Sequence, residues 1–417
     1  MTVQTFRSLF PALDGKVYGK ALVYFDNAAT SQRPRSVIDK YARMSRDANA
    51  NIYRAVHKLS ADATEAYEQG REAVRAFIGA ASREEIIFTS GCTAAVNTVA
   101  YSFGEAFVRP GDVIVVGGAE HHSNLVPWQQ LCLRKGADLR VLSVDEDGHW
   151  NMDELGRLLG AQPDGAASRV KLVAVAHISN VLGLVNPVEE VIGMAHAAGV
   201  PVLVDGAQGI VHEAVDVQAM DCDFYCFSGH KLYAAPGTGV LYGKKKWLEA
   251  MPPFLYGGEM VDTVTLEKTT FAGLPHKFEA GTGNFTAVAT FPEAVETARL
   301  AREPQLRAAF DETCRCLEDA LKARSDIRLY GASGDAAGPY RRAGVCSFTV
   351  DGVHHEDLAQ LLDKMGVAVR SGLMCAEPVI RHFGVSGMLR ASLLPYNTLQ
   401  EVEYFMQCLD KAVTMLR

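Results

Sequence analysis

Residues 224 to 231 read FYCFSGHK, an apolar and aromatic run that stops abruptly in a polar tetrapeptide. The apolar part predicts a buried strand, and Lys231 follows soon after its end. A lysine in such a place is poorly hydrated, so its pKa falls and its amine can act as a nucleophile. The same side chain could instead extend to water, which is the commoner behaviour of a lysine at the end of a strand.

A second strand upstream decides between these two interpretations. Residues 202 to 208 read VLVDGAQ, an apolar strand that ends in the carboxylate of Asp205. An aspartate there is often only a turn or helix cap. However, a strand-end aspartate followed by a strand-end Ser-x-His-Lys is what a pyridoxal phosphate (PLP) enzyme needs. The lysine forms a Schiff base with the cofactor, and the aspartate keeps the ring nitrogen protonated.

Further apolar runs alternate with helical patterns, which indicates an α/β fold with a mainly parallel sheet covered on both faces. Strands are expected at 86–89, 113–116, 172–176, 202–205 and 224–228, with a further, antiparallel strand at 240–243. Helices are expected at 60–78 and 188–198. In such sheets ligands bind at the carboxyl ends of the strands. The polar residues that gather there are Thr93, His121, Asn180, Asp205, Gln208, Ser228, His230 and Lys231.

The C-terminal third predicts a second, smaller α+β domain. Residues 252 to 290 are rich in Gly, Thr and Pro and are expected to form long loops with a functional role. Helical patterns resume from about residue 293, and strands are expected at 345–350, 367–370 and 389–393. We therefore predict a large domain over 24–292 and a small domain formed by 1–23 and 293–417.

Composition excludes several classes of protein. The chain has 417 residues, 48% of them hydrophobic, which suffices for two domains. A net charge of -8 gives no reason to expect nucleic acid. No apolar run is long enough for a bilayer and no signal peptide is evident, so a cytoplasmic protein without a membrane partner is expected. The nine cysteines lack metal-site spacing, and the adjacent side chains of His121 and His122 diverge, so no metal is predicted.

Four motifs carry a resemblance to a known family: EHHSN at 120–124, VDGAQ at 204–208, SGHKLY at 228–233 and RSGLMCA at 370–376. In this order and at this spacing they resemble the class V aminotransferases of PLP fold type I. More narrowly, they are similar to the group II, SufS-type cysteine desulfurases. The resemblance covers essentially the whole chain and implies a homodimer.

The resemblance implies a role for each matching residue around PLP. Lys231 would hold the cofactor as a Schiff base and carry protons, Asp205 would pair with the ring nitrogen, and His121 would stack on the ring. Gln208 would donate a hydrogen bond to the phenolic oxygen. The phosphate would be held by Thr93, Ser228 and His230, with the partner subunit's Thr282. The substrate carboxylate would be bound by Asn180 and Arg390, whose guanidinium offers a bidentate fork.

Cys375 would be the second catalytic group, the nucleophile that takes sulfur from L-cysteine. Its position in a polar, Gly-containing loop suits a thiolate, which needs exposure and a nearby positive charge such as Arg370 or Arg390. The products would be L-alanine and an enzyme persulfide, passed to a sulfur-acceptor protein for iron–sulfur cluster assembly. Alternatives are a selenocysteine lyase, a cysteine sulfinate desulfinase, another class V transaminase or epimerase, or a non-catalytic scaffold.

The sequence departs from the family at four places. Leu373 and Met374 stand where two histidines are common, Tyr53 replaces a frequent histidine, and Cys92 replaces a frequent threonine. Residues 232 to 239 read LYAAPGTG where many relatives have LYGPTG. The changes at Tyr53 and 373–374 bear on access and proton handling around Cys375. None removes a group needed to hold PLP.

Overall fold

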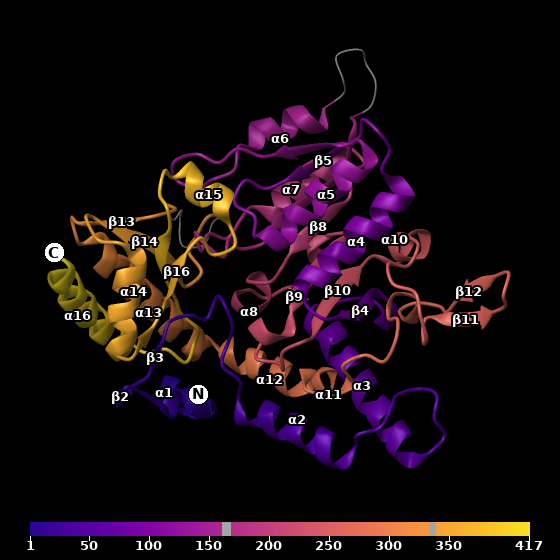
Figure 1. The fold of residues 1–417 in the computed structure, drawn as a ribbon, viewed down its shortest axis with the longest axis horizontal. Helices are drawn as coiled ribbons and strands as arrows, with labels where there is room; N and C mark the ends of the chain where they lie inside the picture. The colour runs from indigo at the N-terminus through magenta and orange to yellow at the C-terminus, as the bar shows by residue number, and fades with distance from the viewer. Residues whose placement is uncertain (161–167, 333–338) are drawn as a thin grey trace.

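The computed structural model describes residues 1–160, 168–332 and 339–417 and has a seven-stranded sheet at its centre (Figure 1). The spatial order is β4-β10-β9-β8-β7-β5-β6. β10 is antiparallel to both neighbours, and the other neighbouring strands are parallel. The α/β fold class and the antiparallel strand are thus confirmed. The strands are β4 (Ile86–Thr89), β5 (Val113–Val116), β6 (Asp138–Val141), β7 (Val170–Ala176), β8 (Val202–Asp205), β9 (Phe224–Ser228) and β10 (Gly239–Gly243).

Alternate residues of the inner strands enter two separate cores, which buries the sheet on both faces. In β5, Val113 and Val115 belong to one apolar cluster, whereas Ile114 and Val116 belong to the other. Helices α4 (Cys92–Phe107) and α5 (Val126–Lys135) cover the second cluster. The helices α3 (Lys58–Phe77), α6 (Met152–Leu159) and α7 (Val188–Ala197) cover the first. The period of two in a strand explains why apolar runs, rather than alternating patterns, mark these strands.

A second, antiparallel sheet lies beside the first, in the order β13-β14-β17-β16. Its strands are β13 (Ile327–Leu329), β14 (Val345–Val350), β16 (Arg370–Gly372) and β17 (Met388–Ser392). A third apolar cluster joins it to α13 (Pro304–Lys322), α14 (His355–Lys364) and α16 (Leu399–Leu416). The division of the chain into two domains at the predicted boundaries stays a prediction.

The start of the chain packs against segments that lie far along the sequence. β3 (Val23–Tyr24) pairs in parallel with β15 (Val367–Ala368), so the strand predicted at 367–370 is divided between β15 and β16. The N-terminal helix α1 (Val3–Arg7) is followed by Phe10, whose ring lies 5.7 Å from that of Tyr233. The lead-in is thereby anchored just behind Lys231.

The prediction of long loops over residues 252 to 290 is confirmed for most of the segment but misses its regular elements. This segment contains the hairpin β11 (Val261–Val264) and β12 (Thr269–Phe271), which projects from the body of the molecule (Figure 1), and the short helix α11 (Phe285–Val288). Because the hairpin buries neither face, its sequence carries no alternation of apolar and polar residues. Leu266 at its turn is fully exposed.

The remaining helices connect these parts. They are α2 (Arg35–Asp47), α8 (Gly209–His212), α9 (Val217–Met220), α10 (Lys245–Ala250), α12 (Phe291–Ala301) and α15 (Glu377–His382), and the short strands β1 (Lys16–Val17) and β2 (Lys20–Ala21) form a hairpin. Within the described ranges, no helix combines the length and apolar character that crossing a membrane requires.

A buried ion pair joins α3 to the segment after the hairpin. Arg71 is fully buried, and its guanidinium donates to both oxygens of Glu279, at 2.7 and 2.9 Å. The same carboxylate accepts the N–H of Phe88 in β4 at 2.7 Å. One pair of side chains therefore holds a helix, a strand and the loop that leads to Thr282.

We expect Arg71→Met to lower the free energy of unfolding by about 3–5 kcal/mol, because it leaves the Glu279 carboxylate buried without a cation. Arg75→Met on the same helix should cost less than about 1 kcal/mol, since its pair with Glu72 is partly exposed. Urea unfolding measures both variants. Equal losses would show that burial of the Arg71 pair is unimportant.

Candidate active site

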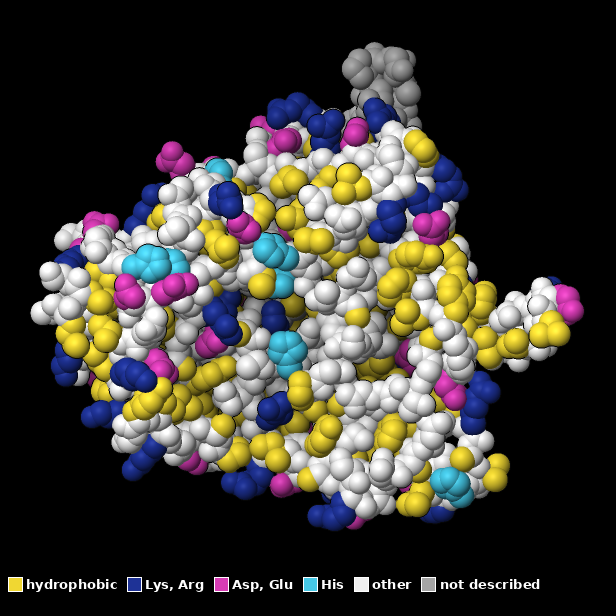
Figure 2. Space-filling model, viewed as in Figure 1, with side chains coloured by type: hydrophobic (Ala, Val, Ile, Leu, Met, Phe, Trp, Pro, Cys, Tyr) yellow, Lys and Arg dark blue, Asp and Glu magenta, His cyan; other side chains and the backbone are white. Residues whose placement is uncertain are grey.

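A cavity of about 540 Å³ lies at the carboxyl ends of the parallel strands, where the two sheets meet. Figure 2 shows histidine, lysine and arginine side chains gathered around a depression in the middle of this face. Of the predicted site residues, all but Thr282 line the cavity. They are Thr93, His121, Asn180, Asp205, Gln208, Ser228, His230, Lys231, Cys375 and Arg390. The structure thus brings together residues spread over nearly 300 positions of the sequence.

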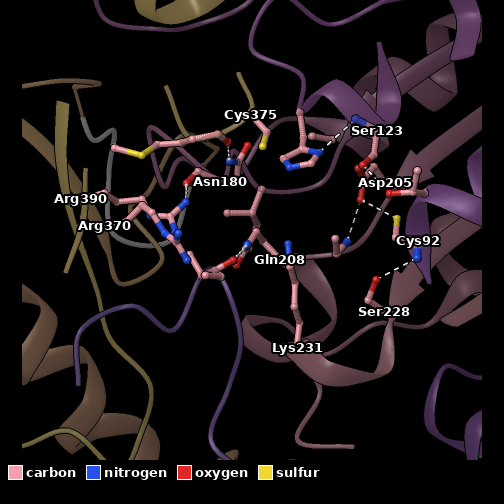
Figure 3. Close-up of a pocket in the computed structure, with 18 of the residues that line it drawn as sticks. Cys92, Ser123, Asn180, Asp205, Gln208, Ser228, Lys231, Arg370, Cys375 and Arg390 are labelled. Carbon is pink, nitrogen blue, oxygen red and sulfur yellow. Dashed lines mark hydrogen bonds between the residues drawn. The ribbon is translucent and has the colours of Figure 1, made fainter. Parts of the chain in front are cut away.

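Asp205 and Lys231 lie at the ends of the neighbouring strands β8 and β9 (Figure 3). Asp205 is buried, and its Oδ1 accepts the N–H of Ala207 at 2.9 Å. The residue after Asp205 has to be glycine, because a Cβ at Gly206 would lie 2.0 Å from the Tyr225 ring. Loss of hydration lowers the pKa of the Lys231 amine, against the opposing effect of the Asp205 carboxylate. The lysine is therefore poised to lose its proton.

Hydrogen-bond donors collect at the start of α4. Ser228 Oγ accepts the N–H of Cys92 at 2.8 Å, and the hydroxyl groups of Thr93 and Ser123 lie 2.6 Å apart. Gly239 packs directly on this turn, since a Cβ there would lie 2.4 Å from the Gly91 backbone. The Cys92 N–H is already bonded, and the N–H groups and hydroxyls that follow it in the first turn of this 16-residue helix suit a phosphate group.

His230 completes this end of the cavity. Its Nδ1 lies 3.2 Å from the hydroxyl oxygen of Thr30. Burial lowers the pKa of His230 to about 4, and the neighbouring Lys231 acts in the same direction. The ring is therefore neutral near pH 7 and can donate only one N–H.

His121 is held in one tautomer over the cavity. Its Nδ1 accepts the N–H of Ser123 at 3.0 Å, so its proton lies on Nε2. Burial, followed by the charge of Lys231, lowers the pKa of His121 to about 4. The preceding Glu120 accepts the N–H of Ala176 at 2.8 Å and the amide of Asn124 at 2.7 Å, which fixes the start of this loop. A neutral ring in a fixed place suits stacking on a cofactor.

Two amide side chains bind neighbouring backbone carbonyls. Gln208 donates from Nε2 to the carbonyl of Ala28 at 2.7 Å, so one of the two N–H groups of its side-chain amide is already used. Asn180 donates from Nδ2 to the carbonyl of Met374 at 2.8 Å. Asn180 therefore supports the loop of Cys375 as well as lining the cavity.

Arg390 lies in an ion-pair cluster that the sequence did not reveal. It is buried, and its guanidinium donates to Asp26 Oδ1 at 3.2 Å and to the carbonyl of Asn180 at 2.9 Å. Arg370 donates to the other oxygen of Asp26 at 2.8 Å. The Nε of Arg390 is buried without a hydrogen-bond partner in the described ranges. The only sequence signal for Asp26 is its position directly after a strand.

Cys375 lies on a loop of strained backbone at the rim of the cavity (Figure 3). Its φ is 54° and that of Met374 is 50°, in the left-handed region that costs non-glycine residues free energy. The loop is held by the N–H of His122, which donates to the Cys375 carbonyl at 2.7 Å. All nine cysteines are described, and only Cys375 is exposed.

Thr282 lies in a second cavity of about 280 Å³, together with Tyr53 and Glu279. The hydroxyl of Tyr53 donates a hydrogen bond to the carboxylate of Glu68 at 2.6 Å. The structure therefore separates both residues from this chain's own Cys375. A role for Thr282 in the other subunit's site stays a prediction.

Comparison with known proteins now identifies the family. Residues 23–405 match the family model described as Aminotransferase class-V. The chain belongs to the class-V aminotransferase family. The resemblance seen in the sequence is thereby confirmed at the level of class V, and the narrower SufS-type assignment stays a prediction. Membership also makes this chain an enzyme.

Several relatives are similar to this chain over nearly its full length. The cysteine desulfurase of Pectobacterium carotovorum is 42% identical, with 99% of this chain and 98% of that protein covered. Among solved structures, the cysteine desulfurase CsdA of Escherichia coli has a TM-score of 0.89 and 36% identity, with both chains covered completely. That of Thermococcus onnurineus has a TM-score of 0.90 and 33% identity, with 100% of this chain and 99% of that chain covered.

We expect the ring of His122 to control the mobility of the Cys375 loop, since its Nε2 accepts the N–H of Glu377 at 3.2 Å. His122→Ala should speed alkylation of Cys375 by iodoacetamide several-fold, because loss of one hydrogen bond, about 1 kcal/mol, raises the population of open loop conformations. His382→Ala, an exposed histidine of α15, is the control. Mass spectrometry of the Cys375 peptide follows the reaction, and an unchanged rate in His122→Ala would contradict this role.

Proposed function

We propose that this enzyme is a PLP-dependent L-cysteine desulfurase that releases L-alanine and keeps the sulfur on Cys375. The observation that carries the proposal is the placement of the one exposed cysteine at the rim of a cavity that also contains Lys231 and Asp205. Two of these groups suit PLP chemistry, and the thiol suits acceptance of sulfur. The names of the relatives support the same activity.

The side chains present fit PLP. The hydroxyl groups of Thr93 and Ser123 lie at the start of α4, an anion lies at the end of β8, and an amine with lowered pKa lies at the end of β9. Lys231 would hold the cofactor, Asp205 would pair with its ring nitrogen, and His121 would cover its ring. The phenolic oxygen would face Gln208, and the phosphate would be held by Thr93, Ser228 and His230. When bound, PLP withdraws electrons from the substrate and makes its Cα–H acidic.

Arg390 would bind the substrate carboxylate, with Asn180 beside it. The unpartnered Nε of Arg390 supplies a donor, and burial of the guanidinium strengthens its attraction for an anion. Asp26 holds the guanidinium in position and offsets part of its charge. The substrate would thus be oriented with its side chain toward the rim.

Proton and sulfur transfer would then be divided between two residues. Lys231 Nζ would accept the proton from the substrate Cα and later return a proton to the substrate carbon. The Cys375 thiolate would attack the substrate sulfur, so that an S–S bond forms while the Cβ–S bond breaks. The electron pair of that bond stays with the carbon skeleton, which after protonation leaves as alanine. The thiol lines the same cavity as Lys231 and Arg390.

The same scaffold would serve a selenocysteine lyase or a cysteine sulfinate desulfinase, which need less help from Cys375 because their leaving groups depart more readily. A transaminase would need no exposed thiol at all. Family membership sets aside a non-catalytic scaffold. A homodimer, a sulfur-acceptor protein, a role in iron–sulfur cluster assembly and a cytoplasmic location stay predictions.

The first test concerns the cofactor. The purified protein should be yellow, and borohydride should fix PLP to Lys231, because that amine is the one beside Asp205 with a lowered pKa. Lys277 also has a pKa lowered by burial but lies outside the cavity, and it serves as the internal control. Peptide mapping that places the adduct on Lys277 or any other lysine would overturn the assignment.

The second test separates the desulfurase from its alternatives. Cys375→Ala should keep the cofactor spectrum and its change on adding L-cysteine, yet form alanine and sulfide at less than about one-hundredth of the wild-type rate, since the sulfur has no acceptor. Activity on selenocysteine should persist. Cys316→Ala, a half-buried cysteine of α13, is the control.

Wild-type enzyme treated with L-cysteine and no reductant should carry one extra sulfur on Cys375, which peptide mass spectrometry can locate. Normal turnover of L-cysteine by Cys375→Ala, or a persulfide on Cys92 or Cys346, would falsify this role of the thiol. Production of an oxo acid in place of alanine would favour a transaminase.

A further inference from the structure

The two oxygens of the Asp205 carboxylate have different surroundings. Oδ1 accepts the N–H of Ala207 at 2.9 Å and lies 3.3 Å from the Cys92 sulfur, whose thiol donates to it (Figure 3). No hydrogen bond to Oδ2 is found within the described part of the chain, and Asp205 lines the cavity. Oδ2 is therefore the oxygen left for a ligand.

Cys92 is held firmly enough to direct this carboxylate. It is the first residue of α4 and is buried, and its own N–H donates to Ser228 Oγ at 2.8 Å. Burial and the nearby Asp205 raise the pKa of its thiol well above the usual value. The sulfur therefore keeps its proton at neutral pH and acts as a donor, not as a thiolate. One residue thus contacts both the phosphate end and the Asp205 end of the cavity.

We propose that Cys92 is a positioning residue for Asp205. The Cys92 thiol fixes the Asp205 carboxylate so that Oδ2 faces the ring nitrogen of the cofactor. The proposal rests on the proposed function, because it takes PLP to be the ligand. A thiol is a weaker hydrogen-bond donor than a hydroxyl. Cys92 therefore orients the carboxylate while withdrawing little of its negative charge from the ring nitrogen.

The chain offers a matched control in Cys226. Its side chain is also buried, belongs to the same apolar cluster as Cys92, and lies on β9 beside the end of β8. Within the described ranges its thiol makes no hydrogen bond. Although Cys226 is the residue paired with Asp205 across the two strands, replacing it with alanine removes the same atoms from the same core without removing a hydrogen bond to Asp205.

The first measurement uses the S–H stretching band in infrared spectra of the PLP-free protein. The Cys92 band is obtained as the difference between wild type and Cys92→Ser. We expect it at a lower wavenumber in wild type than in an Asp205→Ala background, because donation to a carboxylate weakens the S–H bond. The Cys226 band, obtained from Cys226→Ser, should not show this shift. An equal Cys92 band in both backgrounds would overturn the hydrogen bond.

The second measurement is the rate of PLP release, followed by absorbance in the presence of a trapping apoenzyme. Cys92→Ala should release PLP about five- to tenfold faster than Cys226→Ala, and Cys92→Ser should restore most of the loss because a hydroxyl can make the same hydrogen bond. The pH at which the cofactor absorbance changes should also move in Cys92→Ala but not in Cys226→Ala.

Equal release rates and equal absorbance profiles for Cys92→Ala and Cys226→Ala would overturn the positioning role while leaving the proposed function intact. A wild-type protein that binds no PLP would overturn both proposals. The two failures are therefore distinguishable.

Discussion

The structure depends on the parallel pairing of β8 with β9, because it puts an aspartate and a lysine at one edge of a buried sheet. Parallel strands end on the same side, so Asp205 and Lys231 face one cavity although they are 26 positions apart in the sequence. Neither charge could be kept there by solvation alone. The backbone N–H of Ala207 stabilises the carboxylate, and the carboxylate in turn limits the fall in the lysine pKa. Burial thus makes the Lys231 amine reactive by lowering its pKa. The opposite charges of Asp205 and Lys231 offset part of the free-energy cost of burying them.

The second sheet contributes Arg370 and Arg390 to the cavity, and their contacts join it to the start of the chain and to the loop after β7. Asp26 receives both Arg370 and Arg390, and Arg390 in turn donates to the carbonyl of Asn180. Asn180 then holds the backbone of Met374. Three contacts therefore connect Asp26 to the loop of Cys375.

The sequence predicted the sheet well because its inner strands are buried on both faces and appear as continuous apolar runs. The residues at their ends could be placed in one cavity by topology alone, and Asp205, Lys231 and His121 are found there. The hairpin of β11 and β12 escaped prediction because it buries neither face. The double pairing of Asp26 and the thiol contact of Cys92 also escaped, since each depends on segments far apart in the sequence that only the tertiary fold brings together.

The departure from the family at residues 373–374 acquires a physical meaning in the fold. Met374 is buried and packs into the same core as the sheet, while its carbonyl accepts the amide of Asn180. The apolar side chain of Met374 therefore holds the loop one residue before Cys375. Unlike a histidine at this position, it has no proton to gain or lose. Because strained backbone persists only where its surroundings enforce it, packing at Met374 supplies part of that enforcement. The loop at residues 373–374 therefore contributes position rather than protons, and the titratable ring beside it is that of His122, whose backbone N–H binds the Cys375 carbonyl.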